Sequence, residues 1–142
     1  MGPVRIVVVD DYEPWRSCIV SIIEEDPLLQ VIHEASDGSE AVRMCQELQP
    51  DLVILDVGLP KLSGLEAARQ IRVLSPNSKI LFLSVISSQD VMREALRIGA
   101  AGYITKNDAL RDLLPAIKAA VADEGFLRFT ILPDVWTDNP DE

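Results

Sequence analysis

The sequence predicts a single α/β domain of the (βα)₅ kind, with a parallel sheet covered by helices on both faces. Two observations carry this prediction. Five short apolar runs alternate along the chain with longer segments of helical period. The best-defined runs, VRIVVV, LVIL and ILFL, are continuous, which is typical of parallel strands buried on both faces. A chain of 142 residues that is 48% hydrophobic is long enough to bury one core.

The predicted strands are apolar runs too short to form helices, and each is followed by polar or turn-forming residues. They span residues 4–9, 31–32, 52–55, 80–83 and 103–104. Between them, apolar residues recur at helical spacing, so each segment presents one apolar stripe to the sheet. The stripes run through residues 15–23, 41–48, 65–74, 91–98 and 110–121. We interpret all five stripes as core and assign them no chemistry.

Punctuating residues agree with these helices. Pro14 suits a first helical turn, Asp37 an N-terminal cap and Gly125 a C-terminal cap. Pro115 lies within the fifth stripe, where it would remove a hydrogen bond and clash with the preceding turn. The fifth helix is therefore predicted to start late or to bend.

The composition argues against several classes of protein. There are 13 Lys and Arg against 23 Asp and Glu, a formal net charge of −10, whereas binding to nucleic acid phosphates needs positive charge. The N-terminal run turns acidic after a few apolar residues, unlike a signal peptide or a membrane span. Cys18 and Cys45 lie in predicted helices and are expected to be buried free thiols. We expect a soluble, cytoplasmic protein that binds neither nucleic acid nor membranes directly.

Polar residues that can carry chemistry follow four of the predicted strands. The first strand ends in Asp10 and Asp11, the third in Asp56, the fourth in Ser84 and the fifth in Lys106. In an open parallel sheet, ligands bind at the carboxyl ends of the strands. Each residue alone could be a cap, a turn or a surface charge. Three carboxylates at one edge, however, repel by about 4 kcal/mol per pair at 4 Å and an effective dielectric of 20. Oxygen ligands without His or Cys select a hard cation, so the sequence predicts Mg²⁺.

The same positions resemble a known family. The segments VVDDYEP, LVILDVGLPKLSGLE, ILFLSV and GYITK are similar to motifs of the receiver domains of two-component response regulators, in the same order. The resemblance covers residues 4–124 and implies a flavodoxin-like three-layer sandwich with strand order 2-1-3-4-5. IGAAGYITK and the LLPAIKAA that follows are similar to LuxR-type transcription regulators. Their helix-turn-helix output domain is expected to lie outside this chain.

Carried over by position, the resemblance makes Asp56 the phosphoacceptor for a sensor histidine kinase. Asp11 and Asp56 would bind Mg²⁺ through their carboxylates, Asp10 mainly through a water molecule, and Gly58 through its backbone carbonyl. Lys106 would pair with Asp56 before the reaction and with a phosphoryl oxygen afterwards. A metal and one ammonium supply the charge neutralisation that phosphoryl transfer needs.

The resemblance also implies a route from the acceptor to the surface. Ser84 would donate its hydroxyl to a phosphoryl oxygen and so open space for Tyr103, which corresponds to the family's switch aromatic. Pro60 and Gly64 would shape the loop after the acceptor, with Gly64 letting the third helix begin close to it. The output would be a changed surface of the fourth helix, fifth strand and fifth helix, with a homodimer forming on phosphorylation. His33, the only histidine, is not expected to bind metal.

Two positions depart from the family's pattern. Asn107 stands where many receivers have a proline, often after a cis bond. A non-proline cis bond costs about 2.5–4 kcal/mol, so a trans bond is expected. Val85 stands where many members have a smaller residue, so we expect it to screen the acceptor partly and to slow hydrolysis of the phosphorylated form.

The leading hypothesis is a signalling module that assists its own phosphorylation and dephosphorylation and is not otherwise an enzyme. One alternative is a phosphatase with an aspartate nucleophile, which usually needs a second aspartate where this chain has Gly58. Another is a degenerate receiver that only binds proteins, against which the complete set of site residues argues. Residues 1–125 are predicted to form the receiver and residues 126–142 a mobile tail or linker stub. That tail holds one Arg and four acidic residues and is unsuited to a recognition helix.

Overall fold

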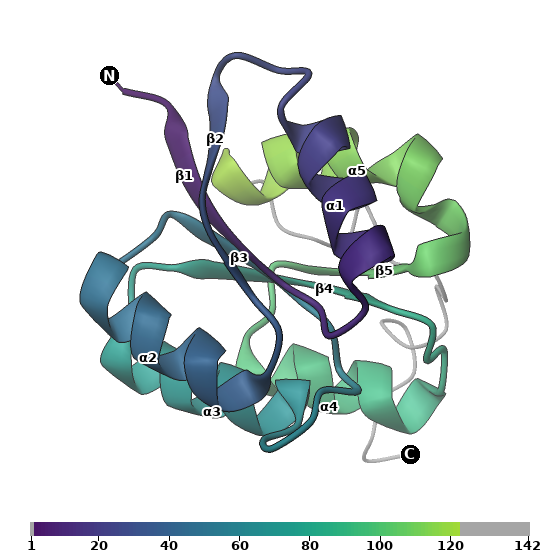
Figure 1. Ribbon diagram of the computed structural model, residues 1–142. Coiled ribbons are helices and arrows are strands. Elements are labelled where there is room, and N and C mark those ends of the chain that lie inside the picture. The colour runs from purple at the N-terminus through teal and green to yellow at the C-terminus, as the bar shows by residue number, and fades with distance from the viewer. Residues whose placement is uncertain (1, 123–142) are drawn as a thin grey trace.

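The computed structural model describes residues 2–122. The chain folds into a five-stranded parallel sheet between two helical layers (Figure 1). The strands are β1 (Val4–Val9), β2 (Leu29–Ala35), β3 (Leu52–Leu55), β4 (Lys79–Ser84) and β5 (Gly102–Thr105). The helices are α1 (Glu13–Ile23), α2 (Gly38–Leu48), α3 (Gly64–Leu74), α4 (Gln89–Ile98) and α5 (Ala109–Val121), with a 3₁₀ turn (Lys106–Asp108) before α5. The strand order β2-β1-β3-β4-β5, with every pair parallel, confirms the predicted flavodoxin-like (βα)₅ fold.

The continuous apolar runs arise because the sheet has a core on each face. In β1, Ile6 and Val8 belong to one core, whereas Val7 and Val9 belong to the other. Helices α1 and α5 cover the first face, and α2, α3 and α4 cover the second (Figure 1). Side chains of a strand alternate between faces, so a strand covered on both sides must be apolar at every position.

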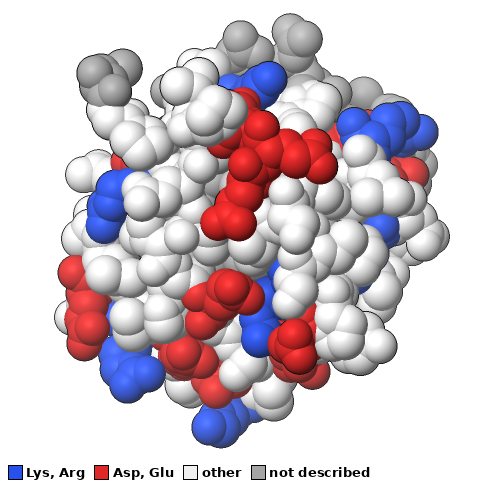
Figure 2. Space-filling model, turned by 45° about the horizontal axis from the view of Figure 1, so that its top comes forward, with Lys and Arg blue, Asp and Glu red and all other residues white. Residues whose placement is uncertain are grey.

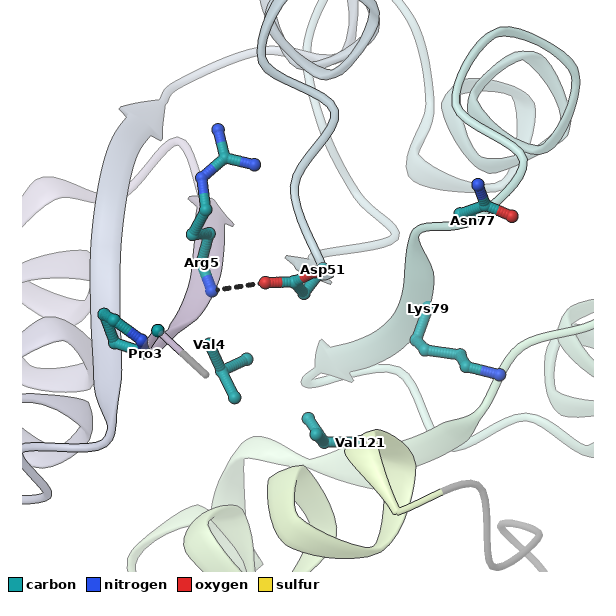
Figure 3. Close-up of a pocket in the computed structure, with 8 residues that line it drawn as sticks. Pro3, Val4, Arg5, Asp51, Asn77, Lys79 and Val121 are labelled. Atoms are coloured by element: carbon teal, nitrogen blue, oxygen red, sulfur yellow. Dashed lines mark hydrogen bonds between the residues drawn. The ribbon is translucent and has the colours of Figure 1, made fainter.

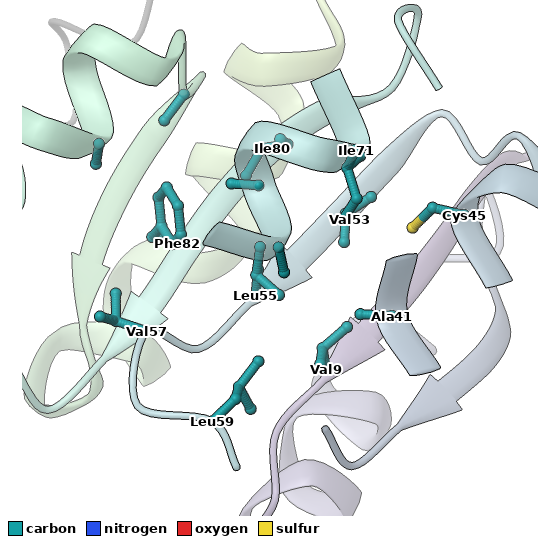
Figure 4. Close-up of a cluster of buried hydrophobic side chains, with 14 of the residues drawn as sticks. Val9, Ala41, Cys45, Val53, Leu55, Val57, Leu59, Ile71, Ile80 and Phe82 are labelled. Atoms are coloured by element: carbon teal, nitrogen blue, oxygen red, sulfur yellow. The ribbon is translucent and has the colours of Figure 1, made fainter. Parts of the chain in front are cut away.

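The core beneath α2 and α3 is shown in Figure 4. Val53 and Leu55 of β3 pack with Ile71 of α3 and Cys45 of α2. Burial raises the pKa of the Cys45 thiol to about 12, so this cysteine is a small packing group and not a nucleophile. Cys18 is also a free thiol on a helix but is only half-buried, so the prediction of full burial is right for Cys45 alone.

Strand β2 is longer than its apolar pattern predicts. The pattern indicates a strand only at residues 31–32, but pairing with β1 extends from Leu29 to Ala35. The polar side chains of Gln30 and Glu34 obscure this strand, because an edge strand can leave part of its surface in water. Its extra length carries the chain to the carboxyl end of β1, next to the acidic residues.

Helix α5 is continuous through Pro115, so the late start considered from the sequence is wrong. Proline at this position leaves the carbonyl of Arg111, four residues earlier, without its helical partner. Both residues are exposed, so water can satisfy that carbonyl. The helix therefore tolerates the proline on its solvent side.

The last described turn of the chain follows α5, with Ala122 at the C-terminal cap of the helix. The predicted cap Gly125 and the predicted tail at residues 126–142 lie outside the described residues. No helix within residues 2–122 has the length and apolar character that crossing a membrane requires.

Candidate functional site

The register of the central strands places two aspartates side by side. Val9 of β1 pairs with Leu55 of β3, so the residues that follow, Asp10 and Asp56, are neighbours. Both are buried, with exposed fractions of 4% and 6%. Asp11 is exposed, and each of the three residues has a carboxylate oxygen within 4.8 Å of the others. The structure thus brings together the three predicted acidic residues.

Lys106 supplies positive charge between the two buried carboxylates. Ser84 of β4 pairs with Thr105 of β5, so the residue after β5 reaches the same edge of the sheet. The Lys106 Nζ lies 2.6 Å from Asp10 Oδ2 and 3.2 Å from Asp56 Oδ2. The resemblance implied pairing with Asp56, and the structure adds Asp10 as the nearer partner.

Burial and ion pairing act against each other on the pKa values of this group. Burial raises the pKa of Asp10, and this outweighs the hydrogen bond from Lys106. Burial lowers the pKa of Lys106, but its hydrogen bond to Asp10 and the charges of Asp56 and Asp10 raise it above the ordinary value. Lys106 therefore stays an ammonium. Three carboxylates facing one ammonium leave an excess of negative charge that favours a second cation.

Short backbone turns fix the other oxygen of each buried aspartate. The N–H of Tyr12 donates to Asp10 Oδ1 at 2.9 Å, and the N–H of Gly58 donates to Asp56 Oδ1 at 3.3 Å. Each hydrogen bond joins residues two apart, so the loop after each strand holds its own carboxylate in place. A Cβ added at Gly58 would meet nothing within 4 Å, so no close approach requires glycine at this position.

Gly64 lets α3 begin against the loop that follows Asp56. A Cβ at Gly64 would lie 1.9 Å from the carbonyl oxygen of Asp56 and 2.7 Å from the Cα of Val57. The carbonyl of Pro60 accepts a hydrogen bond from the N–H of Gly38 at 3.4 Å. The loop is thus held between the starts of α3 and α2.

Ser84 and Tyr103 form a buried pair of hydroxyl groups, with side chains that are 0% and 1% exposed. The Tyr103 hydroxyl donates to the carbonyl of Ile86 at 2.6 Å, and the N–H of Ile86 donates to Ser84 Oγ at 3.1 Å. Burial raises the pKa of Tyr103 to about 12, although a hydrogen bond with Ser84 acts in the other direction. Tyr103 is thus buried with its hydroxyl hydrogen-bonded next to Ser84, and its role as a switch stays a prediction.

Two neighbours of the site were not predicted. Arg16 of α1 donates to the carbonyl of Asp10 at 2.7 Å and to Glu34 Oε1 at 3.0 Å, which ties the acidic loop to β2. The Nζ of Lys106 lies over the ring of Trp15, 5.6 Å from its centroid. The positions of Arg16 and Trp15 in the sequence could have indicated them, because the first helical turn after a strand lies close to a site at the end of that strand.

The remaining sequence departures are at the surface or in loops. The described residues contain no cis peptide bond, so the bond before Asn107 is trans, as predicted. Val85 is 75% exposed, and its effect on hydrolysis stays a prediction. His33 of β2 lies 3.1 Å from Glu40 of α2 and is not among the clustered ligand groups found within residues 2–122.

A pocket lies at the amino-terminal edge of the sheet, opposite the edge that carries the acidic residues (Figure 3). Its volume is about 530 Å³, and Arg5, Asp51 and Val121 are among the residues that line it. The backbone N–H of Arg5 donates to Asp51 Oδ2 at 2.8 Å, and the guanidinium of Arg5 donates to the carbonyls of Leu48 and Gln49. These polar groups hold the fold together, so we assign this pocket no chemistry.

Comparison with known proteins gives the family of the chain. The profile of the response regulator receiver domain matches residues 6–118. The chain belongs to this family. Receiver domains are regulatory signalling modules of two-component systems that bind Mg²⁺ at an acidic pocket and interact with histidine kinases.

Curated relatives of this receiver domain include response regulators and transcriptional regulatory proteins. Response regulator GacA of Pseudomonas viridiflava is 33% identical over 87% of this chain and 58% of its own length. The nitrate/nitrite response regulator protein NarL of Escherichia coli is 33% identical over 92% of this chain and 61% of its own length. The chain therefore spans about three fifths of the length of the curated relatives it matches.

Solved structures of response regulators have the same fold as this chain. A LuxR family response regulator from an Aurantimonas species superposes with a TM-score of 0.84 and 34% identity, over 96% of this chain and 95% of that one. The receiver domain of the putative response regulator NarL from Mycobacterium tuberculosis gives a TM-score of 0.81 and 26% identity, over 86% and 98%. These findings confirm the predicted resemblance to receivers of the LuxR type.

Proposed function

We propose that this receiver domain is a switch that accepts a phosphoryl group on Asp56 from the phosphohistidine of a sensor kinase. The switch would regulate transcription through an output domain outside this chain, in the cytoplasm. One observation carries the proposal: the buried carboxylate of Asp56 lies beside Asp10 and shares the ammonium of Lys106 with it. A carboxylate in this setting is a nucleophile with positive charge already aimed at it.

The donor set fits Mg²⁺. The carboxylates of Asp10, Asp11 and Asp56 and the backbone carbonyl of Gly58 would hold it, which suits a cation that prefers oxygen ligands. When bound, Mg²⁺ supplies charge neutralisation for the carboxylates and for the oxygens of the incoming phosphoryl group. The cluster of three carboxylates, two of which share the ammonium of Lys106, supports this assignment.

The residues of the chain act through charge and position. A carboxylate oxygen of Asp56 forms a bond to phosphorus while the bond from phosphorus to the donor nitrogen breaks, and the imidazole leaves with that electron pair. Phosphoryl transfer depends chiefly on alignment and on neutralising charge. Lys106 provides one positive charge at 3.2 Å from Asp56, and the Gly58 N–H holds the carboxylate in one orientation.

The direct test is the mass of the intact chain after incubation with acetyl phosphate and Mg²⁺. We expect one phosphoryl group to be added, and none when the metal is removed with EDTA. A chain that gains no mass with the metal present would contradict the proposal and favour a degenerate receiver. The complete set Asp10, Asp11, Asp56, Ser84 and Lys106 argues against degeneracy, and Gly58 argues against a phosphatase that needs a second aspartate there.

Replacing Ser84 by alanine is expected to leave phosphorylation in place but to weaken its structural consequence. The Ser84 hydroxyl is hydrogen-bonded to Tyr103. A phosphoryl oxygen on Asp56 would compete with Tyr103 for that hydroxyl. Amide chemical shifts of α4 and β5, measured with and without beryllofluoride as a phosphoryl mimic, would show the response. A full response in Ser84→Ala would contradict this coupling, and Ser84→Thr, which keeps the hydroxyl, is the matched control.

Phosphorylation is expected to change self-association of the chain without creating specific DNA binding. The face seen in Figure 2 carries several groups of acidic side chains with Lys and Arg dispersed around them, which opposes binding to phosphates. Like receivers that pair about a two-fold axis would use the surface of α4, β5 and α5. Sedimentation of both forms would measure assembly, and DNA titrations at several salt concentrations would measure binding. A chain that stays monomeric in both forms would contradict the expected change in self-association. Sequence-selective DNA binding would contradict the expectation that the chain does not bind DNA specifically.

A further inference from the structure

Trp15 adds a third contact to Lys106, besides those with Asp10 and Asp56. The ring belongs to the first turn of α1 and packs against the core on the α1 and α5 face. The ammonium lies over the ring at 5.6 Å from the centroid, within the distance at which a cation is attracted to an aromatic face. By its helical spacing alone, Trp15 is predicted to be a core residue.

The indole N–H of Trp15 gives a second observation. It is buried, and no group among residues 2–122 accepts a hydrogen bond from it. A buried tryptophan usually finds a partner for this N–H. Within the described part of the chain, packing and the contact with Lys106 are therefore what hold the ring, since no hydrogen bond there sets its orientation.

We propose that Trp15 is a positioning residue for Lys106, keeping the ammonium at the acceptor carboxylate while a phosphoryl group is transferred. This inference rests on the proposed phosphorylation of Asp56. The indole itself touches neither the donor nor the reacting atoms. It acts by limiting where the ammonium of a long and flexible side chain can go.

The contacts of Lys106 show why such a constraint matters. Its Nζ lies closer to Asp10, at 2.6 Å, than to Asp56, at 3.2 Å, although Asp56 is the proposed acceptor. An ammonium has three N–H donors, and an aromatic face attracts the charge without needing a specific one of them. Trp15 can therefore hold Lys106 over the site while its N–H groups pass from Asp10 to a phosphoryl oxygen. An aliphatic side chain would fill space there but would not attract the charge.

The test compares phosphorylation rates of the full chain with acetyl phosphate and Mg²⁺. Trp15→Leu is expected to slow the reaction by about three- to tenfold, as loss of a partly buried cation–π contact implies. Trp15→Phe keeps an aromatic face and is expected to restore most of the rate. The matched control is Ile22→Ala, which removes packing from the same core about two turns further along α1 and should lower stability without slowing the reaction.

A spectroscopic measurement tests the contact without any phosphorylation. The chain has two tryptophans, so Trp136→Phe leaves Trp15 as the sole indole. In that background, Lys106→Met is expected to change the emission of Trp15 because it removes the charge over the ring. Lys79→Met, at the opposite edge of the sheet, should leave the emission unchanged.

The outcomes separate this inference from the proposed function. Equal rates in wild type and Trp15→Leu, or equal losses in Trp15→Leu and Trp15→Phe, would overturn the positioning role while phosphorylation stands. Unchanged emission in Lys106→Met would overturn the contact whatever the rates are. A wild-type chain that takes up no phosphoryl group would overturn the proposed function, and with it the role of Trp15 in transfer.

Discussion

Replacing Asp56 by asparagine is expected to reduce phosphoryl uptake from acetyl phosphate below detection. The amide has nearly the shape of the carboxylate, but its nitrogen and neutral oxygen are not nucleophiles for phosphorus. The fold should survive, because the amide oxygen can still accept the hydrogen bond from Gly58, and Lys106 keeps its nearer partner Asp10. Intact mass measures the uptake, and thermal unfolding checks that the variant is folded.

The matched control for this substitution is Asp51→Asn. Asp51 is an exposed aspartate at the opposite edge of the sheet, where it accepts the backbone N–H of Arg5 at 2.8 Å, a role that asparagine can also fill. This variant is expected to take up one phosphoryl group as the wild type does. A phosphoryl adduct of equal yield on Asp56→Asn would place the acceptor elsewhere and remove the basis of the proposed function.

The acidic edge could be predicted because the sheet is parallel. Strands that run in the same direction end at the same edge, so the polar residues after β1, β3 and β5 were expected at one edge once the strands were recognised. The strand order that makes Asp10 and Asp56 neighbours came from the family resemblance. Their identity as a receiver site came from the family resemblance and not from the spacing alone.

The features that could not be predicted depend on the conformations of side chains and on the extent of the edge strand. The preference of Lys106 for Asp10 is a difference of 0.6 Å between two contacts, 2.6 Å and 3.2 Å, which no sequence pattern encodes. The contact between Trp15 and Lys106 joins residues far apart in the chain, and the spacing of Trp15 fits a core stripe equally well. Polar side chains likewise concealed most of β2, because an edge strand does not need a continuous apolar run.

Replacing Gly64 by alanine is expected to destabilise the fold by about 1–3 kcal/mol or more, because backbone cannot yield as a side chain can. The added Cβ would lie 1.9 Å from the carbonyl oxygen of Asp56, far inside contact distance. Helix α3 would have to move away from the loop and stretch the hydrogen bond from the Gly64 N–H to the Val57 carbonyl, now 2.7 Å. Urea unfolding of the two proteins would measure the loss.

The same substitution should also slow phosphorylation, because the carbonyl that it displaces belongs to Asp56, the proposed acceptor. A misplacement of about 1 Å at a reacting group can cost on the order of 10²-fold in rate. Gly58→Ala is the stability control, since a Cβ at Gly58 meets nothing within 4 Å and should change the unfolding free energy by less than about 0.5 kcal/mol. If Gly64→Ala were as stable as Gly58→Ala, α3 would not be held against the acceptor loop. If Gly64→Ala were destabilised yet phosphorylated at the wild-type rate, the position of Asp56 would depend on β3 and its own turn, and not on the start of α3.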